Sequence, residues 1–161
     1  MRTNLLKIFA FLSGLFSISG CDNTVDVNAD WQEIMVVYGL LNPTDDVNYI
    51  RITKAFLNPE GNAVQIAGIS DSLYFDSLEV VIQEFKNGNP INVMTLELVD
   101  GNLIGIPKDS GLFASDVNYL YRLNDKIKSD SKYKLQVFNK KSGRIVTAET
   151  DIVKAIKPQD I

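Results

Sequence analysis

From about residue 31 the chain consists of short apolar runs separated by turn residues, and the spacing within the runs is that of strands. In the clearest run Tyr133, Leu135 and Val137 alternate with polar or charged residues, which predicts a strand with one apolar face. We expect strands over residues 31–41, 47–56, 78–85, 91–99, 118–123, 132–137 and 145–152. Strands this short at this spacing predict an all-β protein, an antiparallel β-sandwich of seven to eight strands.

Two of the connections between the predicted strands have a sequence that indicates their structure or role. Asn87-Gly88 lies between two runs and predicts a hairpin turn, whereas residues 57–77 form the longest stretch without strand character. A connection of that length in a compact domain is usually functional or ordered by its own turns.

Residues 31–41 are apolar at both alternating sets of positions, which predicts a strand covered on both sides.

The spacing around Tyr133 resembles a feature of known sandwiches. Ile127 precedes Tyr133 by six residues, and Tyr133-x-Leu135-x-Val137 follows. In immunoglobulin-like and fibronectin-type domains, a tyrosine placed this way in the penultimate strand ties down the preceding loop as a tyrosine corner. The alternative is that Tyr133 is simply a residue that favours strands. The resemblance implies an immunoglobulin/fibronectin-like sandwich, and the sandwich prediction holds under either interpretation.

The first 21 residues have the pattern of an export signal. Arg2 and Lys7 are basic, and residues 8–18 are uncharged but too short for a bilayer span, which needs roughly 20 apolar residues. The segment closes on Ile18-Ser19-Gly20-Cys21, which resembles the lipobox of bacterial lipoproteins. That resemblance implies cleavage before Cys21 and attachment of a diacylglyceryl group to its sulfur. The alternative is an ordinary secretory signal, for which no A-x-A-like site lies nearby.

These signals divide the chain into four parts. We expect a lipoprotein signal peptide (1–20), the lipidated cysteine with a polar, flexible tether (21–30), the β-sandwich (31–153) and a C-terminal extension leading toward further chain (154–161). A lipid anchor with several acyl chains holds a protein stably on a membrane. We therefore expect a protein anchored to the outer membrane of the cell envelope, on its periplasmic or its surface face.

Composition excludes several classes of function. Without residues 1–20 the chain keeps 14 of its 16 basic residues and all 20 acidic ones, a balance that argues against nucleic acid as a partner. The chain has no histidine, and Cys21 is its single cysteine, so catalysis by Ser-His-Asp or Cys-His groups and zinc sites containing histidine are excluded. We expect no enzymatic activity and no cofactor.

Charge is divided unevenly along the chain. Residues 120–161 hold ten basic and five acidic side chains, and residues 21–119 hold four basic and fifteen acidic ones. We favour a mixed surface in which neighbouring strands bring the two sets together. The alternative is a basic edge facing anionic headgroups or an acidic partner, formed by Lys126, Lys128, Lys132, Lys134, Lys140, Lys141 and Arg144.

Acidic clusters give little support for a metal or catalytic site. Asp26-x-Asn28-x-Asp30 has the spacing that opens a calcium loop, but Trp31 and Val37 stand where such a loop needs glycine and glutamate. The carboxylate pairs Asp45/Asp46 and Asp71/Asp76 could serve glycoside hydrolysis in principle. They lie in segments rich in turn-forming residues, where aspartate is common for conformational reasons.

Aromatic residues outside the regular pattern are the better candidates for ligand binding. Tyr74 and Phe75 are adjacent in the long connection, and Tyr119 and Tyr121 share one face of their strand. Flat rings on loops stack on sugars or anchor protein partners at small entropic cost. The alternative, which we favour, is that these rings pack the loop onto the sandwich and line its core.

Longer segments resemble uncharacterised lipoproteins of Bacteroidota. The similar segments are residues 36–45 (VVYGLLNPTD), 48–57 (NYIRITKAFL), 71–75 (DSLYF) and 76–80 (DSLEV). The resemblance spans roughly residues 15–153 and implies a domain of unknown function that begins with an immunoglobulin-like sandwich. The similar segments contain no residue that is known to be catalytic in these lipoproteins. Acidic residues after the lipidated cysteine are associated with surface export in that phylum, and here only Asp22 fits.

The sequence therefore predicts a non-catalytic binding or scaffold module held on a membrane by its lipid. The expected partner is an outer-membrane transporter assembly or a glycan, contacted through residues 57–77. The alternative is a structural subunit, fimbria-like or part of a surface layer, that joins its neighbours through an open sheet edge.

Overall fold

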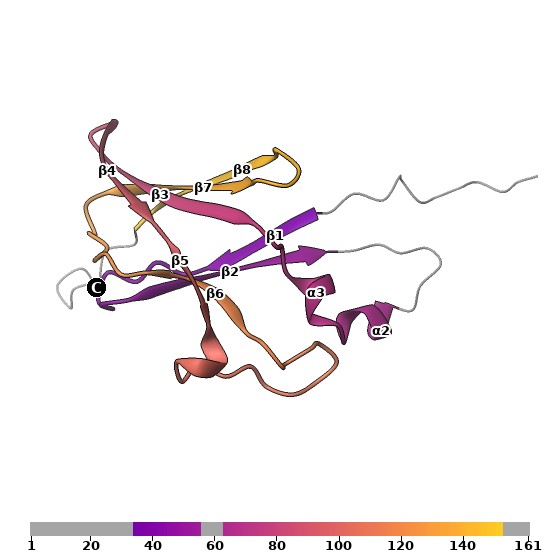
Figure 1. Cartoon of the computed structure of the whole chain (residues 1–161). Helices are drawn as coiled ribbons and strands as arrows, with labels where there is room; N and C mark the ends of the chain where they lie inside the picture. Colours follow the sequence, from indigo (N-terminus) through magenta and orange to yellow (C-terminus); the bar gives the residue numbers. More distant parts are fainter. Residues whose placement is uncertain (1–33, 56–62, 153–161) are drawn as a thin grey trace, which may run out of the picture.

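The structure, a computed structural model, describes residues 34–55 and 63–152, which form two antiparallel sheets of four strands each (Figure 1). The predicted signal peptide, Cys21, the tether and the C-terminal extension lie outside the described residues. One sheet has the order β1 (Ile34–Gly39), β2 (Asn48–Ala55), β6 (Tyr119–Leu123), β5 (Glu97–Asp100). The other has the order β4 (Asn89–Thr95), β3 (Leu78–Lys86), β7 (Lys132–Asn139), β8 (Ile145–Asp151). The prediction of an all-β sandwich is confirmed.

The strand order is that of an immunoglobulin-like sandwich. When the eight strands are lettered A, B, C, C′, D, E, F and G in chain order, the two sheets become ABED and C′CFG. In this arrangement β2 and β6 form the centre of one sheet, and β3 and β7 form the centre of the other. The outermost strands are β1, β5, β4 and β8.

The core lies between the inner faces of the two sheets. Val80, Ile82, Leu123 and Val137 are at most 1% exposed, and each belongs to a central strand. The alternation predicted for β7 is confirmed, because Tyr133, Leu135 and Val137 all join this core. Burial of one such aliphatic side chain contributes about 1.5–3 kcal/mol, so packing can hold the sandwich together without a disulfide.

The corner between β6 and β7 is tied by two buried polar groups. The Tyr133 hydroxyl accepts a hydrogen bond from the backbone N–H of Lys128 at 2.8 Å, which confirms the predicted tyrosine corner. Glu84, only 1% exposed, accepts a hydrogen bond from Ser131 Oγ at 2.7 Å and pairs with Lys128 Nζ at 3.0 Å. A buried carboxylate is tolerated when it is paired in this way, and here the pair fixes the same loop that the tyrosine holds.

The predicted hairpin at Asn87-Gly88 is confirmed, but the strand that follows it differs from the prediction. Asn87 (φ 51°) and Gly88 (φ 80°) adopt the left-handed conformation that a two-residue hairpin turn requires. The single strand expected over residues 91–99 is two strands, β4 and β5, in different sheets. The chain crosses at Leu96, which is buried and donates its N–H to Val80 O at 2.9 Å.

The connection between β2 and β3 contains two short helices, α2 (Ala63–Ala67) and α3 (Ser70–Leu73). They contact each other, and α3 packs near β2. The expectation that this stretch is ordered by its own turns is confirmed for residues 63–77. No helix among the described residues is long and apolar enough to span a membrane.

Candidate functional site

The structure places Tyr74 and Tyr119 in a small second core. Tyr74 is 6% exposed and meets the Tyr119 ring edge-on, with centroids 5.0 Å apart. Its hydroxyl points to Val117 O at 3.4 Å, and burial raises the pKa of Tyr74. Leu73 and Ala114 complete the cluster and fasten the connection onto the sandwich. These two rings therefore have the packing role that was the favoured alternative.

The other two predicted ligand-binding residues also pack against protein. Tyr121 is 5% exposed in the main core, where burial raises its pKa. Phe75 is half-buried against the same core, and the ammonium of Lys54 lies 5.4 Å from its ring centroid. The structure thus brings Tyr74 and Tyr119 together, and it places Tyr121 in the main core with Phe75 packed against that core. Surfaces with more exposed apolar area, which a partner could contact, lie on other elements.

The outer face of β1 is one such surface. Ile34, Val36 and Tyr38 are 53%, 44% and 77% exposed, while Met35 and Val37 between them pack toward the core. The prediction that this strand is covered on both sides is wrong. β1 is an edge strand, and in the described residues nothing covers its outer face. Its apolar side chains there cannot be explained by packing within residues 34–55 and 63–152.

β1 also differs from the other three edges of the described sandwich. Exposed sheet edges are normally protected by charges, proline, irregular pairing or short length. β4 begins with Asn89-Pro90 and pairs irregularly with β3, β5 has only four residues, and β8 carries Glu149 and Asp151. β1 (IMVVYG) has six residues, no charge and no proline, and its register with β2 is unbroken. It is the unprotected edge.

Beside β1 the two sheets separate and leave a cleft of about 460 Å³. The cleft opens between β1 and β8, and its residues come from both sheets. Apolar side chains dominate the lining, with two carboxylates on the β8 side: Val37, Leu40, Leu41, Ile50, Ile82, Tyr133, Leu135, Ala148, Ile152, Glu149 and Asp151. Ile50 and Ile82 are core residues with at most 4% exposure, so the cleft reaches the inner faces of both sheets. It is shaped to take apolar side chains.

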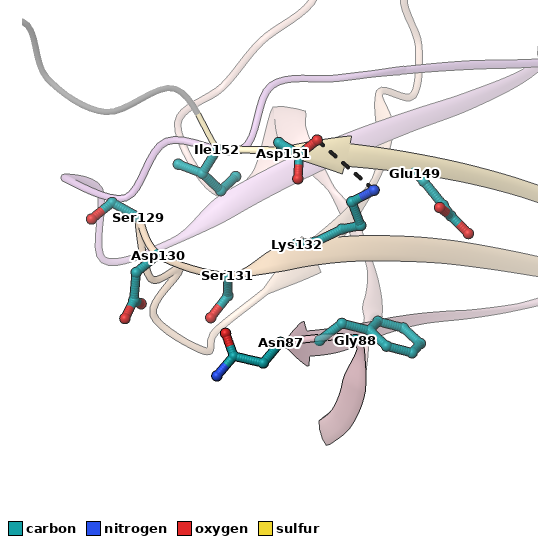
Figure 2. Close-up of a pocket in the computed structure, with 10 residues that line it drawn as sticks. Asn87, Gly88, Ser129, Asp130, Ser131, Lys132, Glu149, Asp151 and Ile152 are labelled. Carbon is teal, nitrogen blue, oxygen red and sulfur yellow. Dashed lines mark ion pairs between the residues drawn. The ribbon is translucent and has the colours of Figure 1, made fainter.

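A second, more polar depression of about 650 Å³ lies at the end of the sandwich that carries the Asn87-Gly88 turn (Figure 2). Its charged groups form ion pairs with each other or with neighbouring lysines. Lys132 lies 3.9 Å from Asp151, and Lys86 lies 2.6 Å from Asp130 and lowers the pKa of that carboxyl. The lowered pKa makes Asp130 a poor general acid or base near neutral pH. Among the described residues, no group of three or more acidic or cysteine side chains is placed to hold a metal ion.

Surface charges pair across the sandwich. Six of the seven residues of the predicted basic edge lie within 4 Å of a carboxylate: Lys126 with Asp46, Lys128 with Glu84, Lys132 with Asp151, Lys134 with Glu149, Lys140 with Glu79 and Lys141 with Asp76. Four of these carboxylates come from the acidic part of the chain. The favoured prediction of a mixed surface is confirmed.

The exposed face of β1 and the cleft were not predicted from the sequence. A signal was present, because residues 34–41 contain no charged side chain on either face. That pattern does not distinguish a covered strand from an unprotected edge, since the distinction depends on what packs against the strand.

No protein family model matches this chain, and no curated protein matches it closely enough to indicate a relationship.

Proposed function

We propose that this protein is an exported lipoprotein of the bacterial cell envelope, anchored to the outer membrane through a lipid on Cys21. Its sandwich is a non-catalytic module that binds another envelope protein. The anchor is supported by the basic start, the short apolar run and the Ile-Ser-Gly-Cys ending of residues 1–21, together with the resemblance to Bacteroidota lipoproteins. The absence of histidine and of a second cysteine from the chain supports a non-catalytic role.

The observation that carries the binding role is the unprotected edge of β1 beside the apolar cleft. An extended segment paired with β1 gains main-chain hydrogen bonds along that edge. Its side chains alternate between two faces, so every second one enters the cleft and the others lie beside Ile34, Val36 and Tyr38. The same contact covers apolar side chains that the described residues leave exposed.

The chemistry of this edge favours a protein partner over a glycan. β1 has no charged side chain and the cleft has an apolar lining, so the matching ligand is an uncharged, extended segment with apolar side chains. A glycan would need an aromatic platform or a set of free polar groups. Tyr74 and Tyr121 are buried, Tyr38 is the one aromatic residue of β1, and the charged groups of the polar depression are paired.

The same edge supports the second candidate, a structural subunit that joins copies of itself. Two β1 strands could pair antiparallel about a two-fold axis without bringing like charges together. In that case the partner is another copy of this chain. The experiment that tests the edge also separates these two candidates.

The test compares two double variants by chemical cross-linking in intact cells. Ile34→Glu/Val36→Glu places charges on the outer face of β1, and Ile91→Glu/Val93→Glu places them on β4, where the original residues are similarly exposed at 50% and 59%. We expect one specific cross-linked species in the wild type and the β4 variant, and its loss in the β1 variant. A species containing two copies of this chain identifies the structural subunit. Cross-linking that survives in the β1 variant contradicts the proposed edge.

A further inference from the structure

A second exposed apolar surface lies at the end of the sandwich where β1 begins. Ile34, the first described residue, pairs with Ala55 at the end of β2. That half of β2 also contacts the neighbouring connections, since Lys54 Nζ donates to Asp71 O and Arg51 Nη2 donates to Asn118 Oδ1. The start of β1, the helices α2 and α3 and the loop of residues 101–118 therefore share one end of the molecule (Figure 1).

The 101–118 loop turns several of its polar groups inward. Asn118 is fully buried, and its Nδ2 donates to Ile106 O at 2.8 Å. Asp100 Oδ1 accepts hydrogen bonds from the N–H groups of Asn102 and Asn118. Gly101 donates its N–H to Asn118 O at 2.7 Å, closing the base of the loop. These bonds give the loop a fixed shape.

Asn102 and Lys108 complete this inner network. Asn102 Nδ2 donates to the carbonyls of Ser115 and Asp116, and Asn102 Oδ1 accepts from Lys108 N. Lys108 Nζ donates to Ala114 O at 2.7 Å, and partial burial lowers the pKa of Lys108. Many polar atoms of the loop are thus bonded within the loop, whereas Asp109 and Ser110, just before Leu112 in the sequence, are exposed.

Its apolar side chains point the other way. Leu103, Leu112 and Phe113 are 84%, 68% and 56% exposed. Ala114 N–H donates to Ala67 O, so the loop is fastened to α2, and Val64 and Ile69 of that neighbouring segment are also more than half exposed. Surface loops normally show the opposite polarity, and an exposed apolar cluster marks a contact surface.

The opposite end of the sandwich is polar. It is formed by residues 40–47, 87–88 and 124–131, which expose mainly Asn, Asp, Lys, Ser and Thr side chains. Leu40, at 80% exposed, is the one large apolar residue that these three segments expose. The end at which β1 begins exposes more apolar residues, and it also carries the charged turn between β7 and β8 with Lys140 and Lys141.

We propose that the 101–118 loop rests in the interfacial region of the membrane that holds the lipid anchor. This inference rests on the anchor of the proposed function. Residues 22–33 separate Cys21 from Ile34, and twelve residues reach at most about 40 Å, so the anchored end of the domain stays close to the bilayer. A bilayer interface accepts Leu103, Leu112 and Phe113 without a complementary pocket, because the acyl boundary is fluid and apolar. The loop then fixes how the domain stands on the membrane and leaves the β1 edge beside it open to a partner.

The test measures the depth of single tryptophans in the lipid-carrying protein, reconstituted into phosphatidylcholine vesicles that contain brominated acyl chains. Trp31 is replaced by Phe, and Phe113→Trp or Leu112→Trp places the probe in the loop. The matched control is Ile91→Trp, because Ile91 is similarly exposed at 50% but lies near the start of β4, beside the Asn87-Gly88 turn at the polar end. We expect both loop probes to lose most of their emission to the brominated lipid and to shift to shorter wavelength, while the control does neither.

The possible results distinguish the contact of the 101–118 loop with the membrane from the lipid anchor on Cys21. Lipid-carrying protein that stays with the vesicles while its loop probes remain unquenched refutes the loop contact and leaves the anchor standing. Loop emission that shifts without quenching shows that protein, such as a second copy, covers the loop, which also refutes the inference. A chain that carries no lipid but is still quenched at residue 113 refutes the anchor and supports the loop contact.

Discussion

Replacing Tyr133 with phenylalanine removes one hydroxyl from the tyrosine corner and leaves the ring in place. Tyr133 is 1% exposed, and its hydroxyl accepts the backbone N–H of Lys128 at 2.8 Å. In the variant that N–H loses its acceptor, while the loop before β7 keeps its other contacts, such as those of Glu84 with Lys128 and Ser131 and the buried side chain of Ile127.

The expected loss in the free energy of unfolding depends on how deeply the Tyr133 hydroxyl and the Lys128 N–H are buried. A lost hydrogen bond costs about 0.5–1.5 kcal/mol, and a donor left buried without an acceptor costs about 1–3 kcal/mol. The Lys128 side chain is 57% exposed, so water can approach the nearby backbone and the second cost stays small. We expect Tyr133→Phe to lower the free energy of unfolding by about 1.5 kcal/mol, or Tm by about 6 °C for a domain of this size.

Urea unfolding followed by circular dichroism measures this difference, and hydrogen exchange of the Lys128 amide reports the bond itself. The control is Tyr38→Phe, because Tyr38 is 77% exposed and its replacement should change stability by less than about 0.5 kcal/mol. If Tyr133→Phe is as stable as the control, or if the Lys128 amide keeps its protection, the hydroxyl does not fix the corner and the reasoning is refuted.

Two further predictions concern the core and the 101–118 loop. Burial raises the pKa of Tyr121, so the folded state holds its proton more tightly than the unfolded chain; the stability this supplies is complete below about pH 10 and is lost as pH rises through the folded-state pKa. The urea midpoint of the wild type should therefore fall more steeply above pH 10 than that of Tyr121→Phe, and parallel profiles would contradict this. A Cβ at Gly101 would lie 2.6 Å from both Asn118 Nδ2 and Ile106 O, so Gly101→Ala should cost about 1–3 kcal/mol in thermal unfolding. Gly111→Ala, which meets no atom within 4 Å, is the control, and equal stability of the two variants would show that the base of the loop yields easily.

The parts of the fold that the sequence predicted are those with local signals. The Asn87-Gly88 turn follows from two residues that tolerate positive φ, and the inner face of β7 follows from simple alternation. The crossing at Leu96 has no such signal, because an apolar residue there fits one continuous strand as well as a change of sheet. Tertiary contacts decide between the two.

The surfaces were harder to predict for the same reason. The burial of Tyr74 depends on Tyr119, which is 45 positions away in sequence, and no local pattern shows that the two rings meet. Residues 100–115 contain Gly101, Gly105, Pro107 and Gly111, which favour turns, but the outward direction of Leu112 and Phe113 results from Asn118 and its partners filling the interior of the loop. Which residues face outward is settled by the hydrogen bonds of the folded chain.

Intact-mass and peptide mass spectrometry of the protein isolated from membranes tests the central claim most directly, because the anchor determines where every proposed contact takes place. The account predicts an amino terminus at Cys21 whose sulfur carries a diacylglyceryl group. A chain that still begins at Met1, or one whose Cys21 is an unmodified thiol, would contradict it.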